Sequence, residues 1–265
     1  MAEREADPQR IAPGPSRIAP GPLRIAMWSG PRNISTAMMR AFENRPDCAV
    51  VDEPFYAAYL ALSEIDHPMR EEVLKSQPAD WRVVADAISG RAPGNQPVYY
   101  QKHMTHHMLP EIGRDWMARC RNVFLIRHPA RVLASYARKR ADVSLRDIGF
   151  AEQEELYDLA CTLGEPPPPI IDADDLLNDP EGILRALCSE IAIPFDEKML
   201  SWPAGGRASD GVWAAHWYDS VNRSTGFEKP RPRPDLTDRG LRAIEKDALP
   251  IYLRLKRRAL RPARP

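Results

Sequence analysis

The sequence has no excess of charge of either sign, because 37 Lys and Arg residues balance 37 Asp and Glu residues. A neutral chain has no broad field to attract nucleic acid or an anionic membrane, so we expect neither as a partner. No apolar run approaches the roughly 18 residues of a membrane span, and the N-terminus lacks the apolar core of a secretory signal. We therefore expect a cytoplasmic protein whose anion site, if it has one, is local.

Cysteine is scarce and lacks the spacing that metal sites and redox pairs require. The four cysteines are Cys48, Cys120, Cys161 and Cys188. Because none of them forms a Cys-x-x-Cys pair, a zinc site and a redox centre are disfavoured. We expect four free, buried thiols.

The first 22 residues differ in composition from the rest of the chain. The hexapeptide "RIAPGP" occurs at 10–15 and again at 17–22. Pro and Gly at this density disfavour both helix and sheet, so residues 1–22 are predicted to form a mobile tail. The remaining residues, 23–265, suit a single domain of ordinary size, as a monomer or homodimer.

Apolar runs typical of buried strands alternate with helical patterns along this domain. The strand-like stretches lie at 23–29, 48–52, 97–104, 121–129 and, more weakly, 168–177, and helical patterns follow at 35–45, 56–65, 130–140 and 181–191. This alternation predicts a three-layer α/β fold with a mostly parallel central sheet flanked by helices. In such sheets ligands bind outside the carboxyl ends of the strands.

The stretch "MWSGPRNISTAMMRAF" at 27–42 predicts an anion cradle, because a strand, a tight loop and a helix N-terminus follow one another. A Walker P-loop would place Lys directly before the hydroxyl residue, and this loop does not. Its cation is Arg32, and Ile34 precedes the hydroxyl pair Ser35 and Thr36. The pattern favours a phosphate-like ligand and disfavours a kinase or ATPase.

A second phosphate site is predicted in "FLIRHPARVLASYARKR". Arg127 lies at the end of a strand, and Ser135 follows eight positions later on the next helix. A guanidinium and a hydroxyl can together bind a phosphate through charge-assisted hydrogen bonds. Two separate phosphate sites indicate a nucleotide that is phosphorylated at both ends.

With these two segments the chain resembles the sulfotransferase family that uses 3′-phosphoadenosine 5′-phosphosulfate. It resembles in particular the bacterial members that act on small molecules. "SGPRNISTAMMRAF" is similar to the family's loop for the 5′-phosphosulfate, and "IRHPARVLASYARK" to its segment for the 3′-phosphate. "IDADDLLNDPEGILRALCSEIAIPF" and "GRASDGVWAAHW" resemble later parts of the family, in the same order. The similarity spans residues 24–227 and implies a P-loop-like nucleotide-binding fold.

The resemblance also implies roles for individual residues. Arg32 stands where the family has a Lys beside the transferred sulfuryl group, and the neighbouring Asn33, Ser35 and Thr36 belong to the loop for the 5′-phosphate. Ile34 replaces a usual glycine. Arg127 and Ser135 are implied to bind the 3′-phosphate. The co-substrate would be 3′-phosphoadenosine 5′-phosphosulfate, with no metal; a kinase-like P-loop enzyme and an inactive nucleotide-binding module remain as alternatives.

The sequence offers two kinds of general base for proton removal from an acceptor. Glu53 ends a strand in "VDEPF", where it could also cap the following helix. In the family's His-using branch the pattern is Lys-x-His, but aligning Lys102 puts Met104 in the place of the His. His106 and His107 could still reach the site. We favour Glu53 as the catalytic base, with His106 as the second candidate, and expect no metal on these histidines.

The C-terminal third contains a long segment, 201–234, that we interpret as a binding lid. Its Trp213 and Trp217 are candidates for stacking on adenine or for packing in the core. A later helical pattern at 237–260 is expected to be interrupted by Pro250.

The acceptor is expected to be a small molecule with a hydroxyl or amine. Its pocket should come from residues 54–95 and 140–165, where four aromatic residues could line a pocket or a core. These are Tyr56, Tyr59, Trp81 and Tyr157.

Overall fold

The structure is a computed structural model that describes residues 21–63, 65, 67–138, 142–164 and 166–263. The first 20 residues, which hold most of the predicted tail, lie outside the described residues. Within the described part, no helix is long and apolar enough to cross a membrane. All four cysteines are free, as expected, but Cys120 and Cys161 are partly exposed.

Five parallel strands form the central sheet, in the order β2-β3-β1-β4-β5. They are β1 (Leu23–Ser29), β2 (Cys48–Asp52), β3 (Val98–Met104), β4 (Arg121–Ile126) and β5 (Ile170–Asp172). The first strand is central, with β3 on one side and β4 on the other, so chain connections diverge at its carboxyl end. A ligand site is expected at such a switch point.

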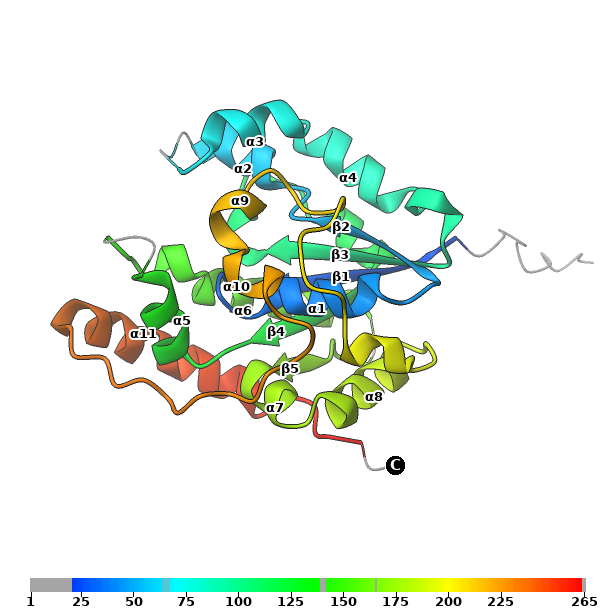
Figure 1. The fold of residues 1–265 in the computed structure, drawn as a ribbon. Coiled ribbons are helices and arrows are strands. Elements are labelled where there is room, and N and C mark those ends of the chain that lie inside the picture. Colours follow the sequence, from blue (N-terminus) through cyan, green and yellow to red (C-terminus); the bar gives the residue numbers. More distant parts are fainter. Residues whose placement is uncertain (1–20, 64, 66, 139–141, 165, 264–265) are drawn as a thin grey trace, which may run out of the picture.

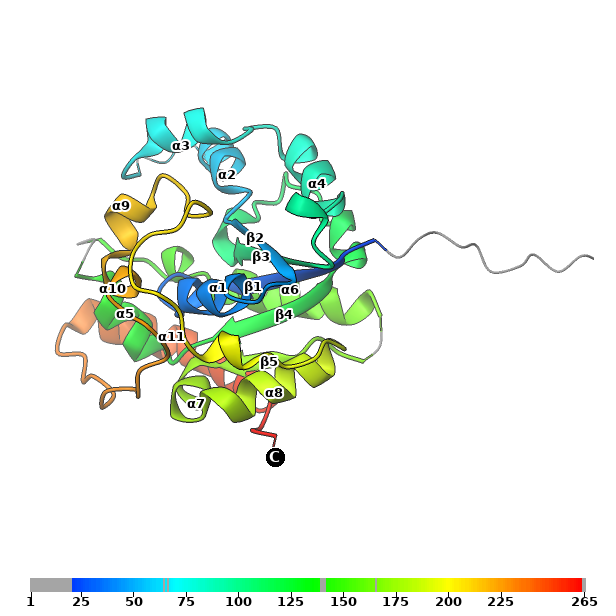
Figure 2. The same ribbon diagram turned by 45° about the vertical axis from the view of Figure 1, so that its right-hand side comes forward.

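Helices cover both faces of the sheet, and the predicted three-layer α/β fold is confirmed (Figures 1 and 2). The helices are α1 (Ser35–Glu43), α2 (Tyr56–Ser63), α3 (Arg70–Ser76), α4 (Trp81–Ser89), α5 (Pro129–Tyr136), α6 (Phe150–Thr162), α7 (Ala173–Asn178), α8 (Pro180–Glu190), α9 (Ala214–Trp217), α10 (Asp219–Asn222) and α11 (Arg239–Lys256). Alternation along β1 separates two cores: Ile25 and Met27 pack beneath α1 and α8, and Ala26 and Trp28 face the side of α6 and α11. Burial on both faces explains why the strands are continuous apolar runs.

The expected interruption at Pro250 is wrong, because α11 runs unbroken from Arg239 to Lys256. Pro250 is exposed, so the carbonyl that loses its helical hydrogen bond lies where water can replace it. On the opposite face, Ala248, Tyr252 and Leu255 are buried on both sides of the proline. Packing across this position outweighs the local cost of the proline.

Residues 201–234, here called the covering segment, run over the carboxyl ends of the strands (yellow to orange in Figure 1). The segment contains the short helices α9 and α10 rather than being wholly irregular. A bidentate ion pair attaches it to α1: Arg40 donates through Nη1 and Nη2 to the two carboxylate oxygens of Asp210, both at 2.6 Å. The side chains are 1% and 6% exposed, so neither charge can rely on water if its partner is lost.

We predict that Arg40→Met destabilises the protein by about 3 kcal/mol, because it leaves the buried Asp210 carboxylate without its partner. Chemical denaturation measures the change. The variant Asp210→Asn should show a similar loss, and combining the two changes should cost less than the sum of the single losses.

A matched surface pair provides the control. Arg185 and Glu181 on α8 also form an ion pair, at 2.7 Å, but their side chains are 37% and 51% exposed. Arg185→Met should therefore cost less than about 0.5 kcal/mol. If Arg40→Met costs no more than Arg185→Met, the covering segment is not held by this ion pair.

Candidate functional site

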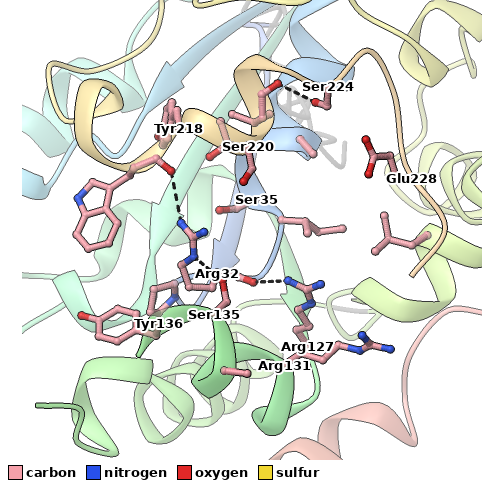
Figure 3. Close-up of a pocket in the computed structure, with 18 of the residues that line it drawn as sticks. Arg32, Ser35, Arg127, Arg131, Ser135, Tyr136, Tyr218, Ser220, Ser224 and Glu228 are labelled. Atoms are coloured by element: carbon pink, nitrogen blue, oxygen red, sulfur yellow. Dashed lines mark hydrogen bonds between the residues drawn. The ribbon is translucent and has the colours of Figure 1, made fainter. Parts of the chain in front are cut away.

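A cleft of about 520 Å³ opens at the carboxyl ends of the strands. Figure 3 shows walls that come from the start of α1, the end of β4 with α5, and the covering segment. The strand ends that carry Glu53 and Lys102 also line the cleft. These parts are distant in sequence, and the parallel sheet brings them together because all its strands end at one edge.

The loop before α1 has an unusual backbone. Arg32 and Ile34 have φ values of 62° and 61°, in the left-handed region that a β-branched residue such as Ile34 rarely adopts. The N-cap, Ile34, makes no side-chain hydrogen bond to the helix, and the first turn of α1 has no acidic residue. Ser35 and Thr36 line the cleft at this turn. The positive N-terminal end of α1 thus faces the cleft, and no acidic side chain in the described first turn neutralises it.

Asn33 belongs to this loop but does not line the cleft. Its side-chain amide is buried and donates to the carbonyl of Leu125 on β4, at 3.1 Å. The side chain of Asn33 therefore fixes the loop to the sheet and does not face the cleft.

The structure brings the two predicted phosphate sites into direct contact. Arg32 donates through Nε to Ser135 Oγ at 3.0 Å, and Arg127 donates through Nη1 to the backbone carbonyl of Arg32 at 2.8 Å. A further cation that we did not predict, Arg131, lines the same cleft and pairs with Asp174 at 2.8 Å. Its position four residues after Arg127, in the first turn of α5, was a usable signal.

Electrostatics favour an anion beside these guanidinium groups. Burial lowers the pKa of Arg127, and repulsion from Arg131 and Arg32 adds to this effect while Asp174 opposes it. Burial, followed by repulsion from Arg138, likewise lowers the pKa of Arg32, although Asp219 offsets part of it. Arg127 Nε is also buried with no hydrogen-bond partner among the described residues. A bound phosphate would supply both the missing partner and the missing charge.

Opposite this cluster, a buried lysine organises two carboxylates and a tyrosine. Lys102 Nζ donates to Asp52 Oδ1 at 2.8 Å, to Glu53 Oε1 at 2.5 Å and to Tyr218 Oη at 2.8 Å. Tyr218 in turn donates to Asp52 Oδ2 at 2.6 Å. Burial disfavours the charge of Lys102, but Asp52 and Glu53 outweigh it and hold the pKa of Lys102 well above its ordinary value. From the sequence, Lys102 served only to align the Lys-x-His pattern, and its hydrogen bonds to the two carboxylates and the tyrosine were not predicted.

Glu53 lines the cleft with a side chain that is 10% exposed. Burial raises the pKa of Glu53 to about 7; the charge of Asp52 adds to the rise and that of Lys102 opposes it. Glu53 contacts the start of α2 through its backbone, because its carbonyl accepts a hydrogen bond from the N–H of Tyr56 at 3.0 Å. The carboxylate contacts Lys102 instead of capping the helix, and the residue has a φ of 40°. Strain of this kind is often found at functional sites.

The histidines of the β3 end separate into two groups. His103 is buried in the core, stacked on Trp28 with ring centroids 4.7 Å apart. His106 and His107 line the cleft, and His107 Nε2 lies 4.0 Å from Glu53 Oε2. Burial lowers the pKa of His106 to about 3 and that of His107 well below its ordinary value. In the described part of the chain, no group of three His, Cys, Asp or Glu residues is placed to hold a metal ion.

The two tryptophans of the covering segment have different surroundings. Trp213 is 1% exposed and donates through Nε1 to Tyr218 Oη at 3.1 Å, so it packs in the core and does not line the cleft. In this structure the ring of Trp213 belongs to the core and does not reach the cleft. Trp217 lines the cleft beside Tyr136, with ring centroids 6.3 Å apart.

Of the four aromatic residues considered for the acceptor pocket, Tyr56 lines the cleft. Tyr157 is buried in the core, and Tyr59 is 7% exposed behind the cleft wall, stacked on His107. Trp81 lies on α4 under the guanidinium of Arg82, away from the cleft lining. Of these four described residues, Tyr56 alone lines the cleft.

Comparisons with known structures support the fold. The sulfotransferase from Alicyclobacillus acidocaldarius matches with a TM-score of 0.53 at 12% identity, covering 90% of this chain and 97% of the other. The sulfotransferase domain from the curacin biosynthetic pathway matches with a TM-score of 0.50 at 17% identity, covering 85% and 97%. At these identities the likeness is evidence for the fold alone.

Relatives in sequence are more similar but longer. The chain is 37% identical over 226 residues to branched-chain-amino-acid aminotransferase-like protein 2 of Arabidopsis thaliana, and 39% identical to protein 1. Each match covers 85% of this chain and 40% of the relative, so the chain spans less than half the length of these proteins. A model of the sulfotransferase domain matches residues 23–259. The chain therefore belongs to the sulfotransferase domain family.

Proposed function

We propose that the protein moves a sulfuryl group from 3′-phosphoadenosine 5′-phosphosulfate to a hydroxyl or amine of a small-molecule acceptor, by in-line displacement. One observation carries the proposal: a guanidinium and hydroxyl cluster and a carboxylate with a raised pKa face the same cleft. The cluster suits a nucleotide with two anionic ends, and the carboxylate suits removal of a proton from an acceptor.

The residues of the cluster fit both ends of this donor. Arg127 and Ser135 are assigned to the 3′-phosphate, because Arg127 has a buried Nε without a partner among the described residues. The first turn of α1, with Ser35 and Thr36, is assigned to the 5′-phosphate. Arg32 lies between Tyr136 and Arg127 in Figure 3, beside both regions.

When bound, the donor supplies the sulfuryl group and a phosphate that leaves. Glu53 Oε2 takes the proton from the acceptor as the new bond to sulfur forms, while Lys102 holds Oε1. Arg32 offsets the negative charge that grows on the departing phosphate oxygen. Because a guanidinium does not give up its proton at neutral pH, Arg32 acts by charge and hydrogen bonding and not as a general acid.

Glu53 is a better base than His106 under this proposal. A base works best when its pKa lies near the working pH, and the pKa values are about 7 for Glu53 and about 3 for His106. His106 is neutral at pH 7 but holds a proton too weakly to drive the transfer. It remains close enough to orient an acceptor.

We predict that 3′-phosphoadenosine 5′-phosphate binds without Mg²⁺ and well ahead of ATP, which lacks the 3′-phosphate. Calorimetry in the presence of EDTA measures both affinities. Arg127→Ala should weaken binding of the bisphosphate by about 2–4 kcal/mol, because it removes a charge-assisted pair from a partly desolvated site.

Adenosine 5′-phosphate serves as the ligand control for this variant. Its affinity should be nearly the same for wild type and Arg127→Ala, since it has no group at the 3′ position. Equal affinity of the wild type for ATP and the bisphosphate, or an absolute need for Mg²⁺, would count against this donor and favour a kinase-like enzyme.

We also predict that Glu53→Gln lowers turnover by about 10²–10⁴-fold while affinity for the bisphosphate is retained. In the wild type, kcat/KM should fall as the pH drops through about 7, because the protonated Glu53 carboxyl cannot accept a proton. This acid limb should be absent from the pH profile of Glu53→Gln.

His106→Ala is the matched control, since His106 lines the same cleft and should cost less than Glu53→Gln. Thermal melting checks that each variant is folded. The assignment of the base is wrong if Glu53→Gln keeps near-normal turnover while a histidine variant is inactive.

A further inference from the structure

A continuous row of rings lines the cleft between Glu53 and Arg32. We call it the aromatic wall; it consists of His107, Tyr56, His67, Trp217 and Tyr136, all of which line the cleft. Successive ring centroids are 4.5, 5.5, 6.0 and 6.3 Å apart in that order. The five rings come from α2, α5, the short turn that follows β3, the covering segment and the chain between α2 and α3.

The two ends of the wall lie at the two groups assigned to the chemistry. At one end, His107 Nε2 is 4.0 Å from Glu53 Oε2. At the other end, the Trp217 carbonyl accepts from Arg32 Nη1 at 3.4 Å, and Tyr136 directly follows Ser135. An acceptor must touch the base and also reach the sulfuryl group near Arg32. It must therefore lie along this wall.

The wall is weakly polar despite its hydroxyl and imidazole groups. The Tyr56 hydroxyl is already paired with His67 Nδ1, at 2.7 Å. Burial keeps the pKa of His107 well below its ordinary value, so this ring is neutral at pH 7. His107 stacks against both Tyr56 and Tyr59, so its faces are used within the protein, whereas the rings of His67 and Trp217 are partly exposed in the cleft. The wall therefore offers these two rings for stacking, with the Glu53 carboxylate near one end and the Arg32 guanidinium near the other.

We propose that the acceptor is a phenol: a planar aromatic ring that carries its nucleophilic hydroxyl directly and packs along the aromatic wall. The inference rests on the proposed sulfuryl transfer and names its substrate class. In the reaction, the phenolic oxygen bonds to sulfur and its proton passes to Glu53. The bond from sulfur to the donor phosphate breaks, and its electron pair leaves with 3′-phosphoadenosine 5′-phosphate.

Other acceptor classes fit the wall less well. A sugar needs several hydrogen-bond partners around its ring, and the Tyr56 hydroxyl is engaged within the protein. A protonated amine would be attracted to rings and to Glu53, but its nitrogen has no lone pair for attack. A phenol is also more acidic than an alkanol, so a carboxylate can remove its proton more readily.

This placement assigns Trp217 to the acceptor and not to adenine. The ring of Trp217 contacts His67 and Tyr136, which belong to the wall. The chain offers a ring elsewhere in the cleft, Phe227, in the part of the covering segment that follows Ser224. The two roles of Trp217 can be separated because they affect different ligands.

The first experiment compares acceptors of matched size on the wild-type protein, with 3′-phosphoadenosine 5′-phosphosulfate as donor. The acceptors are 2-naphthol, its saturated analogue decahydro-2-naphthol, and methyl glucoside. We expect kcat/KM for 2-naphthol to exceed that for the saturated alcohol by at least about tenfold, since stacking on two or more rings is lost. Methyl glucoside should be the poorest.

The second experiment changes the wall. Trp217→Leu should raise KM for 2-naphthol by about tenfold and leave the affinity for 3′-phosphoadenosine 5′-phosphate within about twofold, whereas Trp217→Phe should largely restore KM. Trp81→Leu is the matched control: Trp81 is also a partly buried tryptophan, but it lies away from the cleft lining and should leave KM unchanged.

The outcomes distinguish this inference from the function on which it rests. If the bisphosphate fails to bind, the proposed donor is wrong. If it binds but decahydro-2-naphthol or methyl glucoside reacts as well as 2-naphthol, the phenol assignment alone is overturned. A loss of bisphosphate affinity in Trp217→Leu with KM unchanged would return Trp217 to adenine and also overturn it, as would the failure of 2-naphthol to react at all.

Discussion

The site depends on one buried charge, the ammonium group of Lys102. A lysine that is 1% exposed is stable only if its three N–H groups meet acceptors, because an unpaired buried charge is very costly. The acceptors are Asp52 and Glu53, at the end of β2, and Tyr218, in the covering segment. Satisfying this lysine therefore fixes the candidate base and holds the covering segment over the cleft at the same time.

Charged side chains gather at the two ends of the cleft. Arg32, Arg127 and Arg131 gather at the ends of β1 and β4, while carboxylates and Lys102 occupy the ends of β2 and β3. The arginine end gains from a bound anion, since burial and mutual repulsion already oppose its charges. The other end has a carboxyl group whose pKa lies near neutrality. The aromatic wall lies between the two ends, which is why we propose a flat acceptor for the space between them.

Much of the fold and part of the site could be predicted from the sequence. Apolar runs located the five strands, because both faces of a parallel sheet are buried. Spacing placed Arg127 and Ser135 together on one strand and helix. The spacing of residues along the sequence could not predict contacts between distant segments, such as those of Arg32 with Ser135 and of Lys102 with Tyr218.

Local patterns also failed where tertiary packing decides. The i, i+4 spacing of Trp213 and Trp217 suggests one shared face, yet α9 is a single short turn and the two rings diverge into core and cleft. Among the described residues, six non-glycine residues have positive φ, and three of them, Arg32, Ile34 and Glu53, line the cleft. No propensity predicts left-handed backbone at such residues, because the surrounding structure imposes it.

The most direct measurement follows isotopic label from ³⁵S-labelled 3′-phosphoadenosine 5′-phosphosulfate into an acceptor in the presence of EDTA. We expect labelled product and 3′-phosphoadenosine 5′-phosphate to form in equal amounts, without a metal ion. Absence of label from every acceptor, together with metal-dependent transfer of ³²P from the terminal phosphate of ATP, would contradict the proposed function.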